Sequence, residues 1–143
     1  MGFWLNVRQS TEASMTEPAS TFSGRRYINV ESYKKDGAPK RTPVQSIEDS
    51  GTIYFRTGPN TWKVKRIRRN PHVRIVLSDR SGNPTGAWFD GDARILEGAE
   101  RTRVEALFKK QYGAVGNSLV NLVGRMRGEK LTTFVSVTLR PQP

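Results

Sequence analysis

Residues 56–71 hold most of the side chains in this chain that could bind or activate a ligand. Thr57 and Thr61 flank a Gly-Pro loop, and Lys63 follows in the expected first turn of a helix. The N-terminus of a helix offers unpaired N–H groups and a partial positive charge, and the threonine hydroxyls and the lysine add further donors. The segment contains no acid. We therefore predict that a phosphate binds at the loop that leads into this helix.

The rest of the helix is rich in cations, with Lys65, Arg66, Arg68 and Arg69 following Lys63. Taken one at a time, these side chains are typical of a solvated helix face. Val64 and Ile67 lie three residues apart and are predicted to face the core. This spacing leaves Lys63 outside the inward stripe, near the mouth of the loop.

The overall charge agrees with an anionic partner. The chain has 143 residues with 24 Lys and Arg against 13 Asp and Glu, which gives a formal net charge of +11. Nucleic acid, an anionic membrane and a phosphorylated small molecule all fit such a surplus. No segment approaches the roughly 18 consecutive apolar residues of a membrane span. We therefore expect a soluble protein with no membrane partner.

Several classes of site are disfavoured by composition. The sequence has no cysteine and a single histidine, His72. Disulfides, thiolate metal sites and a cysteine nucleophile are absent as a result, and a histidine-rich zinc site or a Ser-His-Asp triad is disfavoured. We predict no metal site and a cytoplasmic location, and we interpret His72 as an ordinary residue at the start of a strand.

The elements that must position the loop form an antiparallel pattern. Alternating apolar residues and turn signals predict strands at 27–33, 40–47, 52–57, 73–77, 87–95 and 131–139. Helical spacing predicts helices at 62–69, at 104–112 and after the capping candidates Asn117 and Ser118. Six strands close most readily into a barrel, because closure removes exposed edges. We predict a barrel domain over residues 25–143, preceded by a flexible arm over residues 1–24.

The second strand is interrupted by a proline. Arg41-Thr42-Pro43-Val44 lies mid-strand, where a proline cannot donate to a ladder and therefore indicates an edge or a bulge. The exposed backbone groups of such a strand could bond the edge of a planar heterocycle, and Arg41 could pair with a phosphate. An ordinary edge strand explains the pattern equally well.

Taken in order, these motifs resemble the pyridoxamine 5'-phosphate oxidase-like split-barrel superfamily, and within it the probable deazaflavin-dependent enzymes. The resemblance covers about residues 25 to 140. Its most specific part is the string KVKRIRRNP at 63–71, accompanied by KDG at 35–37, RTPV at 41–44, RTG at 56–58, GNPTG at 82–86, GDAR at 91–94 and KQYG at 110–113.

The resemblance implies a mainly β fold, a six-stranded antiparallel split barrel with peripheral helices. It implies a homodimer whose cofactors lie in clefts between the subunits, with the phosphate bound by Thr57, Thr61 and Lys63 and the ring lined by Thr42, Pro43 and Val44. The candidate cofactor-binding residues are Arg41, Thr42, Pro43, Val44, Arg56, Thr57, Gly58, Thr61, Trp62 and Lys63. No catalytic residue can be named.

The implied activity is hydride transfer between the bound cofactor and a small organic substrate. Flavin-using members often carry Ser-Arg-Lys or Arg-x-Lys in the loop, whereas this chain has Thr61-Trp62-Lys63. The missing arginine disfavours an ordinary flavin. The surplus of cations without a nearby acid in the sequence suits the oligoglutamate tail of a deazaflavin coenzyme of the F-420 type, with flavin mononucleotide (FMN) close behind; these cations are Arg56, Lys65, Arg66, Arg68, Arg69 and Arg74. No pyridoxamine-phosphate recognition pattern lies near the C-terminus, so the vitamin-making oxidase reaction is not expected.

Two other functions remain open from the sequence. A basic barrel could bind nucleic acid along the helix at 63–69, although Trp62 is the only aromatic residue there for base stacking. Nucleic acid is therefore the less favoured partner. A cofactor carrier or sensor without turnover is the second alternative.

Overall fold

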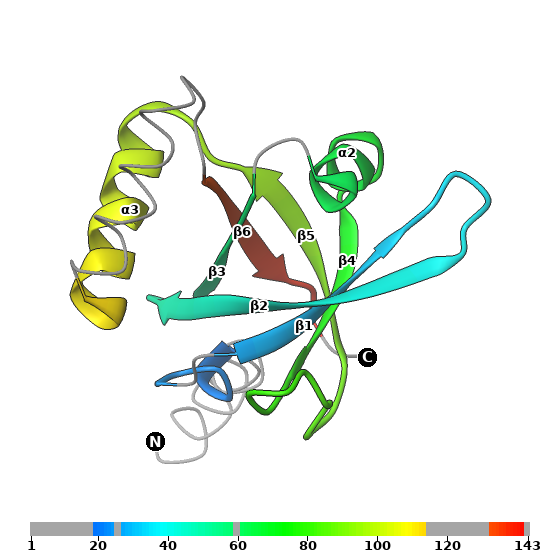
Figure 1. Ribbon diagram of the computed structural model, residues 1–143, viewed down its shortest axis with the longest axis horizontal. Helices are drawn as coiled ribbons and strands as arrows, with labels where there is room; N and C mark the ends of the chain where they lie inside the picture. Colours follow the sequence, from blue (N-terminus) through cyan, green and yellow to red (C-terminus); the bar gives the residue numbers. More distant parts are fainter. Residues whose placement is uncertain (1–18, 25–26, 59–60, 114–131, 142–143) are drawn as a thin grey trace, which may run out of the picture.

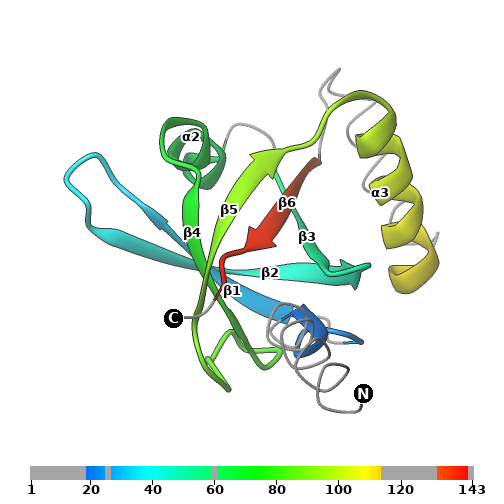
Figure 2. The same ribbon diagram turned by 180° about the vertical axis from the view of Figure 1, so that it is seen from behind.

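Six antiparallel strands close into a barrel in the computed structural model of the chain, in the spatial order β1-β2-β3-β6-β5-β4 (Figures 1 and 2). The structure describes residues 19–24, 27–58, 61–113 and 132–141. Its elements are β1 (Tyr27–Tyr33), β2 (Pro39–Asp49), β3 (Thr52–Thr57), α2 (Trp62–Arg69), β4 (His72–Leu77), β5 (Phe89–Ile95), α3 (Gly98–Tyr112) and β6 (Thr133–Leu139). The predicted split-barrel class is confirmed, and His72 begins β4 as expected. The helix predicted after Ser118 lies outside the described residues.

The core fills the barrel because alternate residues of each strand point inward. Val30, Phe55, Ile75 and Val135 are completely buried and belong to this interior cluster. A second cluster, which includes Tyr54, Val104, Phe108 and Phe134, lies between α3 and the outer face of the strands. Helix α2 contacts β1 and β5, so the two helices cover different parts of the barrel (Figure 1). None of the described helices is long and apolar enough to span a membrane.

Part of the segment expected as an arm belongs to the core. Ala19 and Phe22 are 2% and 1% exposed and pack into the interior cluster. The Phe22 ring meets Phe89 edge-on, with 5.6 Å between ring centroids. The packed part of the chain therefore begins before residue 25, which corrects the boundary expected from composition.

Strand β2 changes partners along its length. Pro39 to Gln45 pair with β1, whereas β3 pairs only from Gln45 onward. Pro43 pairs with Asn29 of β1 and lies where β2 has no second partner strand. The N–H group that proline lacks is therefore not needed for a hydrogen bond to β3. The interpretation of Pro43 as an edge position is confirmed. The β1–β2 hairpin runs past the barrel wall beside α2 (Figure 1).

Candidate functional site

Helix α2 begins and ends where local chemistry requires. Thr61 is its N-cap, and the Thr61 Oγ1 accepts a hydrogen bond from the Val64 N–H at 3.3 Å. The helix ends at Asn70, because a residue before proline disfavours helical backbone angles. The predicted bounds and cap are confirmed. The first N–H groups of α2 have no helical acceptor and are therefore available to a ligand.

Lys63 is buried beneath this first turn. Only 6% of its surface is exposed, alongside the buried Val64 and Ile67. Its Nζ donates to the Thr57 Oγ1 at 2.9 Å. Thr57 is two residues from the buried Phe55 on β3, so both side chains point to the barrel side of the strand. This places Thr57 within reach of the ammonium. The placement of Lys63 outside the inward stripe is therefore wrong, because Lys63 and the buried Ile67 are four residues apart and share one face of the helix.

The surroundings of Lys63 favour an anion. Burial, and then the nearby charge of Arg66, lower the pKa of Lys63 to about 8. Within the residues that the structure describes, its ammonium pairs with no carboxylate. A buried cation without an opposite charge is costly, and a bound phosphate supplies that charge. The donor set of ammonium, hydroxyl and helix N–H groups fits a phosphate.

The other loop candidates lie close to this pair. A Cβ added at Gly58 would lie 3.3 Å from the Thr61 Cγ2, so the loop backbone runs tightly against the capping threonine. On β2, Val44 is 8% exposed within the interior cluster. Thr42, opposite Val30, lies on the same side by alternation. Thr42 and Val44 thus lie on the barrel side of β2, and Thr57 lies on the barrel side of the neighbouring β3, where it accepts the Lys63 bond.

Arg41 and Pro43 lie on the opposite face of β2. The Arg41 Nε donates to the Glu31 Oε2 at 2.8 Å, and its guanidinium lies 4.7 Å from the Trp88 ring centroid. Pro43 lies against the turn that contains Gly82. Burial raises the pKa of Glu31, but bonds from Arg41 and Tyr33 outweigh it and hold that pKa below its usual value. The structure therefore holds Arg41 in an ion pair on the outer wall.

Arg56 also points away from Lys63. Its Nε donates to the Gln45 Oε1 at 2.9 Å. Its guanidinium lies 5.2 Å and 5.1 Å from the ring centroids of Phe108 and Tyr112 in α3. Alternation along β3 separates Arg56 from the buried Phe55 and from Thr57 on either side. The structure does not bring Arg56 together with the loop residues.

Comparison with known proteins places this arrangement in a family. The model of the family described as pyridoxamine 5'-phosphate oxidase matches residues 15–141. The chain belongs to that family. The match starts before residue 25, in keeping with the burial of Ala19 and Phe22. No curated protein gives a match to the chain.

Solved structures of other proteins show the same fold. A putative pyridoxamine 5'-phosphate oxidase from Listeria innocua is 17% identical, with 94% of each chain covered and a TM-score of 0.57. A reductase dependent on reduced coenzyme F-420 is 17% identical over 78% of this chain and 94% of its own, with a TM-score of 0.56. The heme storage protein HutZ from Vibrio cholerae is 13% identical over 90% and 91%, with a TM-score of 0.62.

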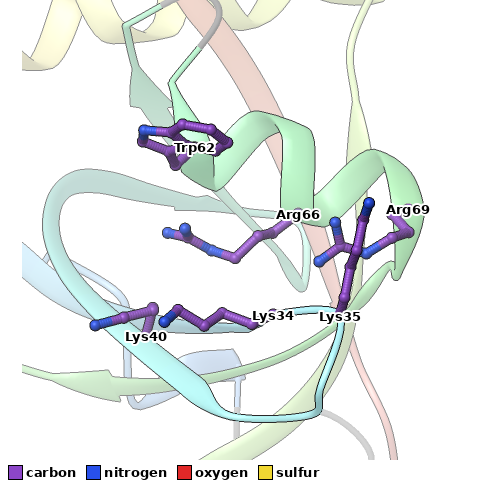
Figure 3. Close-up of a pocket in the computed structure, with 6 residues that line it drawn as sticks. All are labelled: Lys34, Lys35, Lys40, Trp62, Arg66 and Arg69. Carbon is purple, nitrogen blue, oxygen red and sulfur yellow. The ribbon is translucent and has the colours of Figure 1, made fainter.

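Beside α2 lies a groove that the sequence did not reveal, which we term the basic groove. It has a volume of about 440 Å³ and lies between α2 and the β1–β2 hairpin (Figure 3). The Arg66 Nε donates to the Ser32 Oγ at 2.9 Å, and the Arg69 Nη2 donates to the Tyr33 carbonyl at 3.0 Å. Its lining residues are Lys34, Lys35, Lys40, Trp62, Arg66 and Arg69. Of the α2 cations expected on a solvated face, Arg66 and Arg69 are instead attached to the hairpin.

Proposed function

We propose that this protein is an oxidoreductase that transfers hydride between a bound, phosphorylated deazaflavin or flavin and a small organic substrate. The buried Lys63–Thr57 pair at the N-terminus of α2 is the observation that carries the proposal. When bound, the cofactor supplies the hydride chemistry. The protein supplies the phosphate site and the position of the ring.

The residues of β2 are suited to positioning the cofactor ring. β3 pairs with β2 only from Gln45 onward, so the backbone around Thr42 and Val44 has one edge that no strand of the described barrel uses. Backbone N–H and C=O groups on such an edge can bond the polar rim of a planar ring. This edge belongs to β2, which also carries Thr42, and it faces toward β3, which carries Thr57. The ring is therefore proposed to lie along β2 with its phosphate at Lys63.

Hydride transfer is tested in a single-turnover experiment. Reduced cofactor is bound to the protein without oxygen and mixed with candidate acceptors, and its reoxidation is followed by absorbance. Reoxidation faster than that of free cofactor supports an enzyme. Binding with no acceleration by any acceptor would leave a carrier and overturn the proposed activity.

The cofactor is proposed to lie in a cleft between two copies of the chain. One small barrel offers a single wall to a planar ring, whereas ligand sites bury most of the ligand. We therefore expect a homodimer, measured by light scattering at micromolar protein concentration with cofactor present. A monomer under these conditions would contradict the two-chain site.

The deazaflavin coenzyme is expected to bind more tightly than FMN. It carries a phosphodiester and an oligoglutamate tail, and Lys65 and Arg68 are exposed cations on α2, the helix that begins at the proposed phosphate site. Arg56 and Arg74 belong to the same surplus of cations in the sequence. In the structure, Arg56 donates to Gln45 and Arg74 forms an ion pair with Glu31. The measurement is a side-by-side titration with FMN, the coenzyme and its tail-less fragment. Equal affinity for coenzyme and fragment would refute a role for the tail, and tighter binding of FMN would reverse the preference.

Cofactor affinity is expected to fall as the pH rises through about 8. Burial lowers the pKa of Lys63 to about 8 in the free protein, and a bound phosphate favours the charged ammonium and raises that pKa. Binding near pH 8 therefore takes up a proton, and affinity is highest below that pH. Titrations with FMN between pH 7 and pH 10 measure this. A flat profile would contradict contact between the ammonium and the phosphate.

A further inference from the structure

The basic groove is lined by cations, which bind anionic groups, and by one aromatic side chain, which stacks on a ring. Five of its six lining residues are cations and the sixth is Trp62. No lining residue is an acid, and none of the five cations forms a salt bridge within the described part of the chain. Burial and the charge of Arg69 lower the pKa of Arg66. Like charges held this close favour a ligand with several negative charges.

Two of these cations are held in place before any ligand arrives. The bonds from Arg66 to Ser32 and from Arg69 to the Tyr33 carbonyl fix both guanidinium groups against the hairpin. Each guanidinium has five N–H donors, so each retains donors for phosphate oxygens. Lys34 and Lys40 lie across the groove from Arg66, and Lys35 lies near Arg69 (Figure 3). The cations thus surround one region from both sides.

Trp62 adds an aromatic surface at the edge of that region. It is 73% exposed and is the only large hydrophobic side chain in the described residues with such exposure. The Lys65 Nζ lies 4.7 Å from the ring centroid, which leaves the second face of the indole for another ring. Base stacking on an exposed aromatic side chain strengthens binding by about fivefold or more per base.

We propose that the basic groove binds a nucleoside polyphosphate, with its base stacked on Trp62 and its phosphates among Lys34, Lys40 and Arg66. One aromatic residue and a volume of about 440 Å³ suit a single nucleotide rather than a nucleic acid strand, which needs several stacking positions. An oligoglutamate chain has the charge but no ring for Trp62. Lys63 does not line the groove, whereas its neighbour Trp62 does, so the groove adjoins the proposed cofactor phosphate site without including its lysine.

The test is calorimetric titration of the full chain, without added flavin or divalent cations, using ATP, inorganic triphosphate, oligoglutamate and a short oligothymidylate. ATP is expected to bind at least about fivefold more tightly than triphosphate, because only ATP stacks. Trp62→Ala should reduce ATP affinity to the triphosphate level and leave triphosphate unchanged, and Trp62→Phe should retain most of the difference. Lys40→Ala should weaken both ligands, whereas Lys109→Ala, which removes an exposed charge from α3, should weaken neither.

Any of four results would overturn the proposal. Equal affinities for ATP and triphosphate, or no effect of Trp62→Ala, would exclude stacking. Oligoglutamate binding as tightly as ATP would assign the groove to a polyanion without a ring. Oligothymidylate binding more tightly than ATP would assign it to single-stranded nucleic acid. Because none of these titrations involves Lys63 or a flavin, their failure leaves the proposed oxidoreductase function untouched.

Discussion

Lys63→Met is expected to lower affinity for FMN and for the deazaflavin coenzyme by about one to two orders of magnitude. A hydrogen bond to a charged group contributes about 1.5 to 3 kcal/mol, and each 1.4 kcal/mol corresponds to about a tenfold change in affinity. Methionine keeps an unbranched side chain in the buried space beside Val64 and Ile67, so the fold should persist. The dissociation constant is measured by cofactor fluorescence or absorbance at pH 7.

The matched control is Lys109→Met, which removes one charge from an exposed lysine of α3. It lowers the net charge by the same amount as Lys63→Met. The loss of cofactor affinity should nevertheless be much smaller, because the interaction of an exposed charge with a distant ligand is screened by salt. Thermal unfolding should show Lys63→Met at least as stable as the wild type, since it removes a poorly compensated buried charge. Equal losses of cofactor affinity in the two variants would show that Lys63 does not bind the phosphate.

Phe22→Ala is expected to destabilise the protein by about 3 to 5 kcal/mol, the usual cost of deleting a buried phenylalanine ring. The ring is 1% exposed and packs against Phe89 and the interior cluster. Removing it would open a cavity inside the barrel. Urea unfolding followed by circular dichroism gives the free energy of unfolding.

Ser23→Ala serves as its control, because Ser23 is exposed and next in sequence. It should change stability by less than about 0.5 kcal/mol, as surface substitutions generally do. A Phe22→Ala variant with wild-type stability would show that residues 19–24 do not contribute to the core. The earlier expectation of an arm up to residue 24 would then be restored.

Local signals in the sequence predicted the barrel strands and α2 well. Alternation predicted β1 and β3 with the bounds that the structure gives them, and Thr61 with Pro71 delimited α2. Such features depend on neighbouring residues, through the two-residue period of strands and the geometry of helix ends. Phe22 gave no such signal, because it stands alone in a polar segment and its burial depends on distant strands.

The site could be predicted only in part, for the same physical reason. The Thr57–Lys63 pair follows from one loop and was predicted as a phosphate site, but the depth of Lys63 depends on how α2 lies across the barrel. Arg56 could have been separated from the site, since it alternates with Phe55 and Thr57 along β3. The basic groove joins the β1–β2 hairpin to α2, and no local pattern reports that contact.

This protein is proposed to bind its cofactor through the phosphate at Lys63 and Thr57. The most direct measurement of this contact is the affinity of the full chain for FMN beside that for riboflavin, the same ring without the phosphate. We predict that FMN binds at least about tenfold more tightly at pH 7, because a charge-assisted phosphate contact contributes about 1.5 to 3 kcal/mol. Equal affinities for the two compounds would show that the protein does not bind the cofactor through its phosphate.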